Sequence, residues 1–151
     1  MGFYPAYICE NGHAVEIGMY SFRDKYCTIC GANIIHQCPA CKTTIKGLDE
    51  DTGGFFTVPS YCRNCGVPFP WTNRAIAATL ELLAEDENIT TEECNRLSDV
   101  LPDIMTETPR TQLAAARLRK AMTVVGSITC EALKQFVIDF GCEAVKLLLK
   151  L

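Results

Sequence analysis

The hydrophobic pattern divides the chain into two parts. From about residue 72 onward the sequence is rich in Ala and Leu, and its apolar positions recur at the three- and four-residue spacing of amphipathic helices. Residues 1–71 lack long apolar runs and are rich in Gly, Pro and other turn residues. We therefore expect an α+β protein, with a small domain over residues 1–71 and an all-α bundle of about four helices over residues 72–151.

Capping residues mark where the predicted helices begin. Thr72 precedes the first, and the capping box Thr90-x-x-Glu93 precedes the second. Thr108-Pro109 places a capping hydroxyl before a proline at the first position of the third helix. Pro102 should kink or split the second helix, because proline removes a backbone donor. The expected ranges are about 72–87, 90 to beyond 104, about 108–125 and about 128–150.

The last of these stretches carries an apolar stripe at helical spacing, and Gly141 is expected to interrupt it. The stripe consists of Leu133, Phe136, Val137, Phe140, Ala144, Leu147, Leu148 and Leu151. Two interpretations remain open: the stripe belongs to the core of a four-helix arrangement, or it docks a partner or a second copy of the chain. Acidic and basic residues balance each other on the polar face, which argues against a membrane-surface helix, because such a helix would have a basic polar face.

The charges of the helical part are segregated along the sequence. Residues 81–107 contain nine acidic side chains and one basic one, whereas residues 110–120 contain four basic side chains and no acidic one. One explanation is that antiparallel helices pair these faces. The other is that the basic residues bind phosphate or an acidic partner. These residues are Arg110, Arg117, Arg119 and Lys120.

The first 65 residues contain four pairs of metal ligands: Cys9-x3-His13, Cys27-x2-Cys30, Cys38-x2-Cys41 and Cys62-x2-Cys65. Eight ligands fill two tetrahedral Zn²⁺ sites. A filled site is structural, because a catalytic zinc keeps one position open to water. Metal binding also supplies folding free energy that so small a domain lacks. We therefore predict two structural zinc ions and no catalytic residues.

Two pairings of these ligands are compatible with the spacing. Sequential pairing joins the first two pairs at one site and the last two at the other, whereas cross-brace pairing, as in RING domains, joins alternate pairs. Seven residues separate Cys30 from Cys38, which leaves room for a short strand at Ile34-Ile35 between two ribbons. We therefore favour sequential pairing.

The turns of the ligand-rich part are also predicted from the sequence. Gly31 and Gly66 follow CxxC pairs, where a left-handed turn residue is needed. Between the last two pairs we expect a hairpin with arms at 43–46 and 55–58 and a turn at 47–54. His36 is expected to be a surface or ribbon-packing residue, and not a substitute metal ligand, because all four ligand pairs are complete. Trp71 is expected to fill the seam between the second ribbon and the first helix.

Ten cysteines in 151 residues raise the alternative of a disulfide-stabilised secreted protein. The CxxC pairs have chelate spacing, and the first residues have neither the basic start nor the apolar core of a signal peptide. We therefore expect a cytoplasmic protein with reduced thiols. Cys94, Cys130 and Cys142 remain outside the pairs. Cys94 lies near a predicted helix N-terminus, where a thiol pKa is expected to fall, but no basic side chain accompanies it.

As a set, the ligand motifs resemble the double zinc ribbon group. They are most similar to a bacterial family of unknown function. The resemblance covers about half the chain. It rests on Ile8-Cys-Glu-Asn-Gly-His13, Cys27-Thr-Ile-Cys-Gly31, Cys38-Pro-Ala-Cys41 and Tyr61-Cys-Arg-Asn-Cys-Gly-Val-Pro-Phe-Pro-Trp-Thr72. It implies bound zinc, a bacterial source and a role in interaction, and it brings no catalytic residues.

We expect a non-enzymatic adaptor that binds a protein partner or a second copy of itself through the C-terminal helices, within a bacterial multi-gene defence or regulatory system. The alternative is a nucleic-acid-binding regulator that uses Lys25, Lys42, Lys46 and Arg63. The formal net charge of −4, which zinc-bound thiolates make more negative, weighs against phosphate binding.

Overall fold

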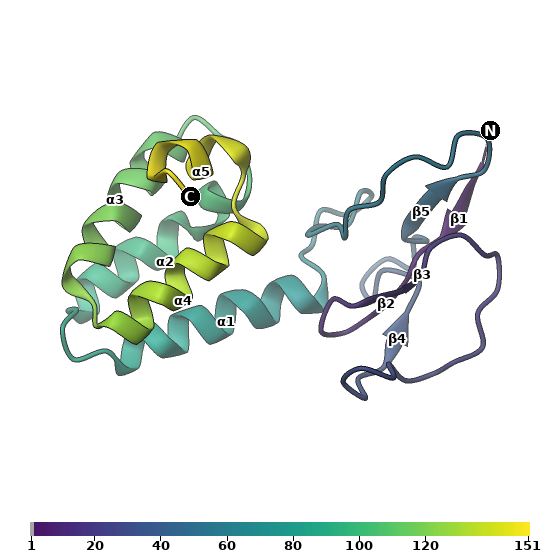
Figure 1. The fold of residues 1–151 in the computed structure, drawn as a ribbon, viewed down its shortest axis with the longest axis horizontal. Helices are drawn as coiled ribbons and strands as arrows, with labels where there is room; N and C mark the ends of the chain where they lie inside the picture. Colours follow the sequence, from purple (N-terminus) through teal and green to yellow (C-terminus); the bar gives the residue numbers. More distant parts are fainter. Residues whose placement is uncertain (1) are drawn as a thin grey trace. The chain divides into compact units, whose positions relative to one another are not determined.

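The computed structural model describes residues 2–151, and the chain separates between Arg74 and Ala75 into two compact units. We call them the ribbon unit, which ends at Arg74, and the helical unit, Ala75–Leu151. Each unit has its own cluster of buried apolar side chains. Short strands lie in the first unit and helices in the second, so the fold is α+β as predicted (Figure 1).

Five short strands form two small antiparallel sheets in the described part of the ribbon unit (Figure 1). In the three-stranded sheet β2 lies between β3 and β4, with Ile8 opposite Ile35 and Cys9 opposite Ile34. The two-stranded sheet pairs β1 with β5. The predicted strand at Ile34-Ile35 is therefore present. The strands are β1 (Phe3–Pro5), β2 (Tyr7–Cys9), β3 (Ala14–Glu16), β4 (Ile34–Ile35) and β5 (Lys46–Asp49).

The predicted hairpin between residues 43–46 and 55–58 is wrong. Residues 43–45 lie antiparallel to residues 36–38, since the Cys38 amide donates to the Thr43 carbonyl at 2.9 Å and the Ile45 amide to the His36 carbonyl at 2.9 Å. β5 then pairs with β1. β1 lies more than forty positions before β5, and alternation of apolar residues within a segment does not indicate which partner the segment will choose.

The core of the ribbon unit is built around Trp71. Its ring stacks on Phe69 at a centroid distance of 4.8 Å, and its Nε1 donates to the Pro59 carbonyl at 2.8 Å. The same cluster contains Ile8, Ile45 and the ligand cysteines Cys38 and Cys62. The apolar core and the second ligand set are therefore packed together.

The first helix, α1 (Pro70–Glu85), begins two residues before the predicted cap. Thr72 is fully buried inside the helix, and its hydroxyl donates to the Ser60 carbonyl at 2.8 Å. Thr72 as helix cap is therefore a wrong prediction. Pro70 suits the first helical position because proline lacks an amide hydrogen that would be left unpaired there.

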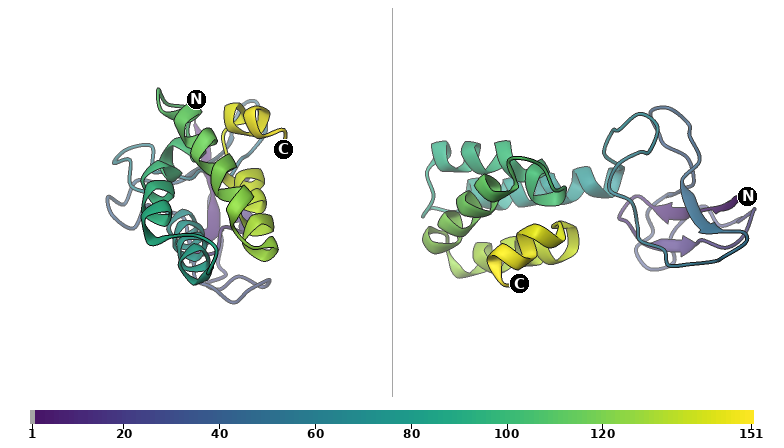
Figure 2. Two further views of the ribbon diagram at one scale, coloured as in Figure 1. Left: turned by 90° about the vertical axis from the view of Figure 1, so that its left-hand side faces the viewer. Right: turned by 90° about the horizontal axis from the view of Figure 1, so that it is seen from above.

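The described residues of the helical unit add four further helices to the part of α1 that lies beyond Arg74. They are α2 (Thr91–Met105), α3 (Thr111–Val124), α4 (Ser127–Phe140) and α5 (Glu143–Leu149). α2 packs on α3 and α4, and the C-terminal α5 contacts α3 and α4 (Figures 1 and 2). No helix among residues 2–151 combines the length and hydropathy of a membrane span.

Gly141 separates α4 from α5, as predicted. Its amide donates to the Val137 carbonyl at 2.7 Å and closes the last turn of α4. A Cβ at this position would lie 2.5 Å from that carbonyl oxygen, so no other residue fits without movement.

The start of α2 agrees with the predicted capping box. The Thr90 hydroxyl accepts from the Glu93 amide at 3.2 Å, and the Glu93 carboxylate accepts from the Thr90 amide at 3.0 Å. Pro102 does not split the helix, which continues to Met105.

The predicted start of α3 at Thr108-Pro109 is wrong. Its cap is Arg110, without a side-chain hydrogen bond, because the Thr108 hydroxyl donates to Asp103 at 2.7 Å and accepts from the Arg110 amide at 3.0 Å. The Thr108 side chain, which the local sequence assigned to the helix cap, therefore bonds to Asp103 of α2 instead.

The C-terminal stripe is divided between core and surface. In α4, Leu133 and Val137 are buried in the core, and Val145 of α5 is fully buried beside them. Leu147 of α5 is 78% exposed and Leu148 is 39% exposed. The core interpretation holds for α4, and the outward leucines of α5 remain available for contacts.

The segregated charges pair between α2 and α3. Arg110 lies 2.8 Å from Asp99 and 3.6 Å from Asp103, and Arg117 lies 3.7 Å from Asp99. Arg119 donates to the Leu148 carbonyl. The interpretation that neighbouring helices match these faces is confirmed for Arg110 and Arg117.

Candidate metal centres

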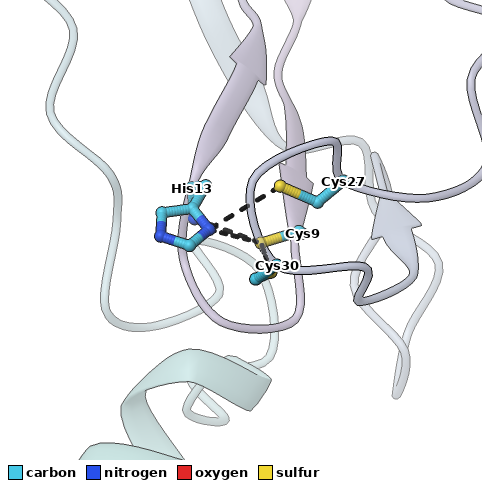
Figure 3. Close-up of side chains that lie close together, drawn as sticks. All are labelled: Cys9, His13, Cys27 and Cys30. Atoms are coloured by element: carbon cyan, nitrogen blue, oxygen red, sulfur yellow. Dashed lines mark hydrogen bonds between the residues drawn. The ribbon is translucent and has the colours of Figure 1, made fainter.

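The first ligand group brings together Cys9, His13, Cys27 and Cys30, whose ligand atoms all lie within 4.8 Å of one another (Figure 3). The Cys9 and Cys30 sulfurs are 3.7 Å apart. The Nδ1 atom of His13 lies 3.4 Å from the Cys9 sulfur and 3.7 Å from the Cys27 sulfur. β2 ends at Cys9, β3 follows His13, and the other two cysteines lie on the next turn.

The second group contains Cys38, Cys41, Cys62 and Cys65, also within 4.8 Å of one another. The sulfurs of Cys38 and Cys65 are 3.7 Å apart, and those of Cys41 and Cys62 are 3.6 Å apart. The grouping follows the sequential pairing, not the cross-brace.

These distances fit tetrahedral zinc. Tetrahedral ligands with sulfur at about 2.3 Å and nitrogen at about 2.0 Å from Zn²⁺ lie about 3.5–3.8 Å from one another. The sulfur–sulfur distances of 3.6 and 3.7 Å agree with this geometry. The two groups, one Cys₃His and one Cys₄, are therefore consistent with two structural zinc sites.

Each ligand pair is held by a turn with one left-handed residue. Gly12, Gly31 and Gly66 have φ of 92°, 75° and 74°, and Lys42 has φ of 64°. The amide of each donates to the carbonyl of the first cysteine of its pair at 2.7–3.0 Å. The sequence pattern predicted a left-handed residue at Gly31 and Gly66 but not at Lys42, although Lys42 also lies directly after a CxxC pair.

Hydrogen bonds prepare part of each site for thiolate ligands. The Ala32 amide and the Asn11 side chain, whose Nδ2 lies 3.3 Å from the sulfur, lower the pKa of Cys30 to about 6. The Thr43 hydroxyl, 3.2 Å from the sulfur, and the Thr43 amide lower the pKa of Cys41 to about 5.

Other thiols in the same sites resist ionisation. Burial raises the pKa of Cys9. The Val67 amide favours the Cys65 thiolate, but burial and the neighbouring sulfurs outweigh it and raise the pKa of Cys65 to about 12. Closely spaced thiols cannot all carry a negative charge without compensation, and a divalent cation supplies it.

A chain of polar contacts supports the first site. Asn11, which donates to the Cys30 sulfur, accepts from Arg74 Nη1 at 2.5 Å. Arg74 also pairs with Glu10 at 3.0 Å. Such contacts orient metal ligands in proteins. No local sequence signal indicates the role of Arg74, since more than sixty positions separate it from both partners.

The remaining candidates lie outside both groups. His36 stacks on Tyr7 at a centroid distance of 5.0 Å, which confirms its packing role. The expected low pKa of Cys94 is wrong: burial, together with the charges of Glu93 and Asp86, raises it. Cys130 and Cys142 belong to neither ligand group.

The chain matches, over residues 3–149, the family described as "uncharacterized protein conserved in bacteria (DUF2321)". It belongs to this family. The match extends through the helical unit, whereas the motif resemblance covered about half the chain. No curated protein and no solved structure matches the chain.

Proposed function

We propose that this protein is a non-enzymatic adaptor, in which two zinc ions hold the ribbon unit rigid and the surface binds other proteins. The observation that carries the proposal is that each ligand group supplies four donors. Four protein ligands complete a tetrahedral zinc and leave no position for water or substrate. Function is then expected on surfaces that the metal sites hold in place.

The outward face of α5 supports a role for the C-terminal helices in association. Leu147, Leu148 and Leu151 are 78%, 39% and 42% exposed within five consecutive positions. Burying apolar surface contributes about 25 cal/mol per Å². Burial of these leucines by a partner or by a second copy of the chain would therefore favour association.

The nucleic-acid alternative has weaker support. Of its four candidate cations, Lys46 pairs with Asp49 at 2.8 Å, and Lys42 donates to the Pro39 carbonyl at 3.2 Å. The Asp49 carboxylate neutralises Lys46, which then contributes little to phosphate binding, and the net charge of the chain is −4.

Native mass spectrometry of the protein purified from its bacterial host tests the proposal. We expect an assembly larger than one chain, either a homo-oligomer or a defined hetero-complex, with zinc retained. Leu147→Glu should reduce this assembly to the single chain. Ile128→Glu is the matched control, because Ile128 is equally exposed, at 78%, but lies at the start of α4. A single chain with nothing bound, in the unaltered protein, would contradict the adaptor role.

A further inference from the structure

The ribbon unit contains a cleft of about 310 Å³ beside the second ligand group, whose Cys62 is one of its lining residues. We call it the aromatic cleft. Residues 43–47 and 53–57 line it, together with Asp49, Pro59, Tyr61, Cys62, Arg63 and Phe69. These segments overlap residues 43–46 and 55–58, which were predicted to pair as a hairpin. The two segments do not form a hydrogen-bonded ladder with each other, and an open cleft lies between them.

Some backbone groups along the cleft have no hydrogen-bond partner among residues 2–151. Among residues 2–151, no hydrogen bond involves the backbone of Phe55, Phe56 or Thr57. Thr43 and Ile45 bond to residues 36–38, so Thr44, whose peptide groups point to the opposite side, leaves its amide and carbonyl unpaired within the described chain. An added extended peptide can satisfy such groups by strand addition.

The cleft also combines a buried apolar floor with an exposed aromatic ring. Ile45 and Phe69 are each 3% exposed, whereas Phe55 is fully exposed. A phenylalanine left in water is an unfavourable arrangement that a bound apolar side chain would relieve. The volume is near the lower end of the roughly 300–1,000 Å³ typical of ligand pockets, so it suits one or two side chains of a peptide.

The charge at the rim indicates which peptide fits. Arg63 lies over the Phe3 ring with its guanidinium carbon 5.1 Å from the centroid, and no carboxylate of residues 2–151 lies within 4.0 Å of it. Lys46 Nζ lies 5.9 Å from the same centroid, but Asp49 neutralises it. Arg63 is therefore the cation whose charge an acidic side chain would complement.

We propose that the aromatic cleft binds an extended segment of a partner protein that places an apolar side chain against Phe55 and an Asp or Glu at Arg63. The proposal rests on the adaptor function and names the class of partner segment. Single-stranded nucleic acid also binds exposed aromatic rings and cations. The unpaired backbone groups and the negative net charge favour the peptide.

A randomised twelve-residue peptide library displayed on phage, panned against the zinc-loaded full chain, tests the assignment. Enriched sequences should alternate apolar residues with others and should contain Asp or Glu. A synthetic peptide of the enriched sequence should bind Phe55→Ala about thirtyfold more weakly, the loss typical of a central aromatic contact. Arg63→Gln should weaken binding about tenfold.

Ile29→Ala is the matched control, because Ile29 is an exposed apolar residue of the same unit that does not line the cleft. It should bind the peptide as the unaltered chain does, and the zinc content of every variant should be unchanged. The cleft assignment fails if no sequence is enriched, if Phe55→Ala binds equally well, or if a single-stranded oligonucleotide displaces the peptide.

The two proposals fail separately. If assembly depends on Leu147 but no peptide is enriched on the aromatic cleft, the adaptor function is supported and the peptide-binding role of the cleft is contradicted. If the chain purified from its host is a monomer with nothing bound, yet binds the enriched peptide at the cleft, the cleft assignment is supported and association through α5 is contradicted.

Discussion

The left-handed turn residues behind the zinc ligands give a prediction that can be worked from the structure. Gly31 and Gly66 have φ of 75° and 74°, and a Cβ added at either position would meet no atom within 4 Å. Substituting alanine therefore leaves packing unchanged and adds only the backbone cost of a left-handed residue, roughly 1 kcal/mol. Because zinc binding is coupled to folding of so small a unit, Gly31→Ala should weaken the first site about fivefold and Gly66→Ala the second.

Lys42 occupies the equivalent position after its CxxC pair, and its substitution is expected to have the opposite effect on zinc affinity. Its φ of 64° already carries the left-handed cost, so Lys42→Gly should relieve it. Glycine also increases the entropy of the unfolded chain, which reduces the gain to about 0.5 kcal/mol, or about twofold tighter zinc at the second site.

Competition for zinc with a chromophoric chelator measures all three variants. Gly18→Ala serves as control, because Gly18 lies outside the left-handed region and a Cβ there would make ordinary contacts, at 3.6 Å to Leu48 and 3.7 Å to Glu16. The reasoning is refuted if Gly31→Ala and Gly66→Ala retain zinc as well as the control does, or if Lys42→Gly binds zinc more weakly than the unaltered chain.

Three further predictions concern the second metal site and the helical unit. Cys41→Ser should remove one zinc per chain by mass while the helical circular-dichroism signal persists, and loss of both ions would contradict independent sites. Leu101→Ala, at a fully buried position, should lower the free energy of unfolding by about 2–5 kcal/mol in urea titrations without changing the zinc content. Hydrogen bonds from Thr129, Asn88 and Gly126 lower the pKa of Asp86 to about 2, so its stabilising contribution is complete above about pH 4 and is lost as the pH falls toward 2. Asp86→Asn should flatten that decline in thermal melts, and an unchanged pH dependence would show that Asp86 does not cause it.

Features set by neighbouring residues could be predicted from the sequence. The capping box at Thr90 and Glu93 and the break at Gly141 depend on contacts within a few positions, and both are present. The ligand groups followed from chelate spacing. The intervening strand at Ile34-Ile35 correctly indicated that the two sites use sequential pairs.

Features decided by distant partners could not be predicted. β5 pairs with β1, which lies more than forty positions earlier, and Thr72 bonds to the Ser60 carbonyl, twelve positions earlier. In each case the segment or side chain makes a tertiary contact in place of the local contact that the sequence pattern predicted. The low pKa expected for Cys94 failed for the same reason, because burial and nearby carboxylates outweigh the helix terminus.

The zinc content of the purified chain tests the central claim most directly. Native mass spectrometry should show two zinc ions per chain, with all ten cysteines free of disulfides once the metal is removed under acidic conditions. One zinc, none, or a mass lowered by disulfide formation among the eight ligands would contradict two closed sites.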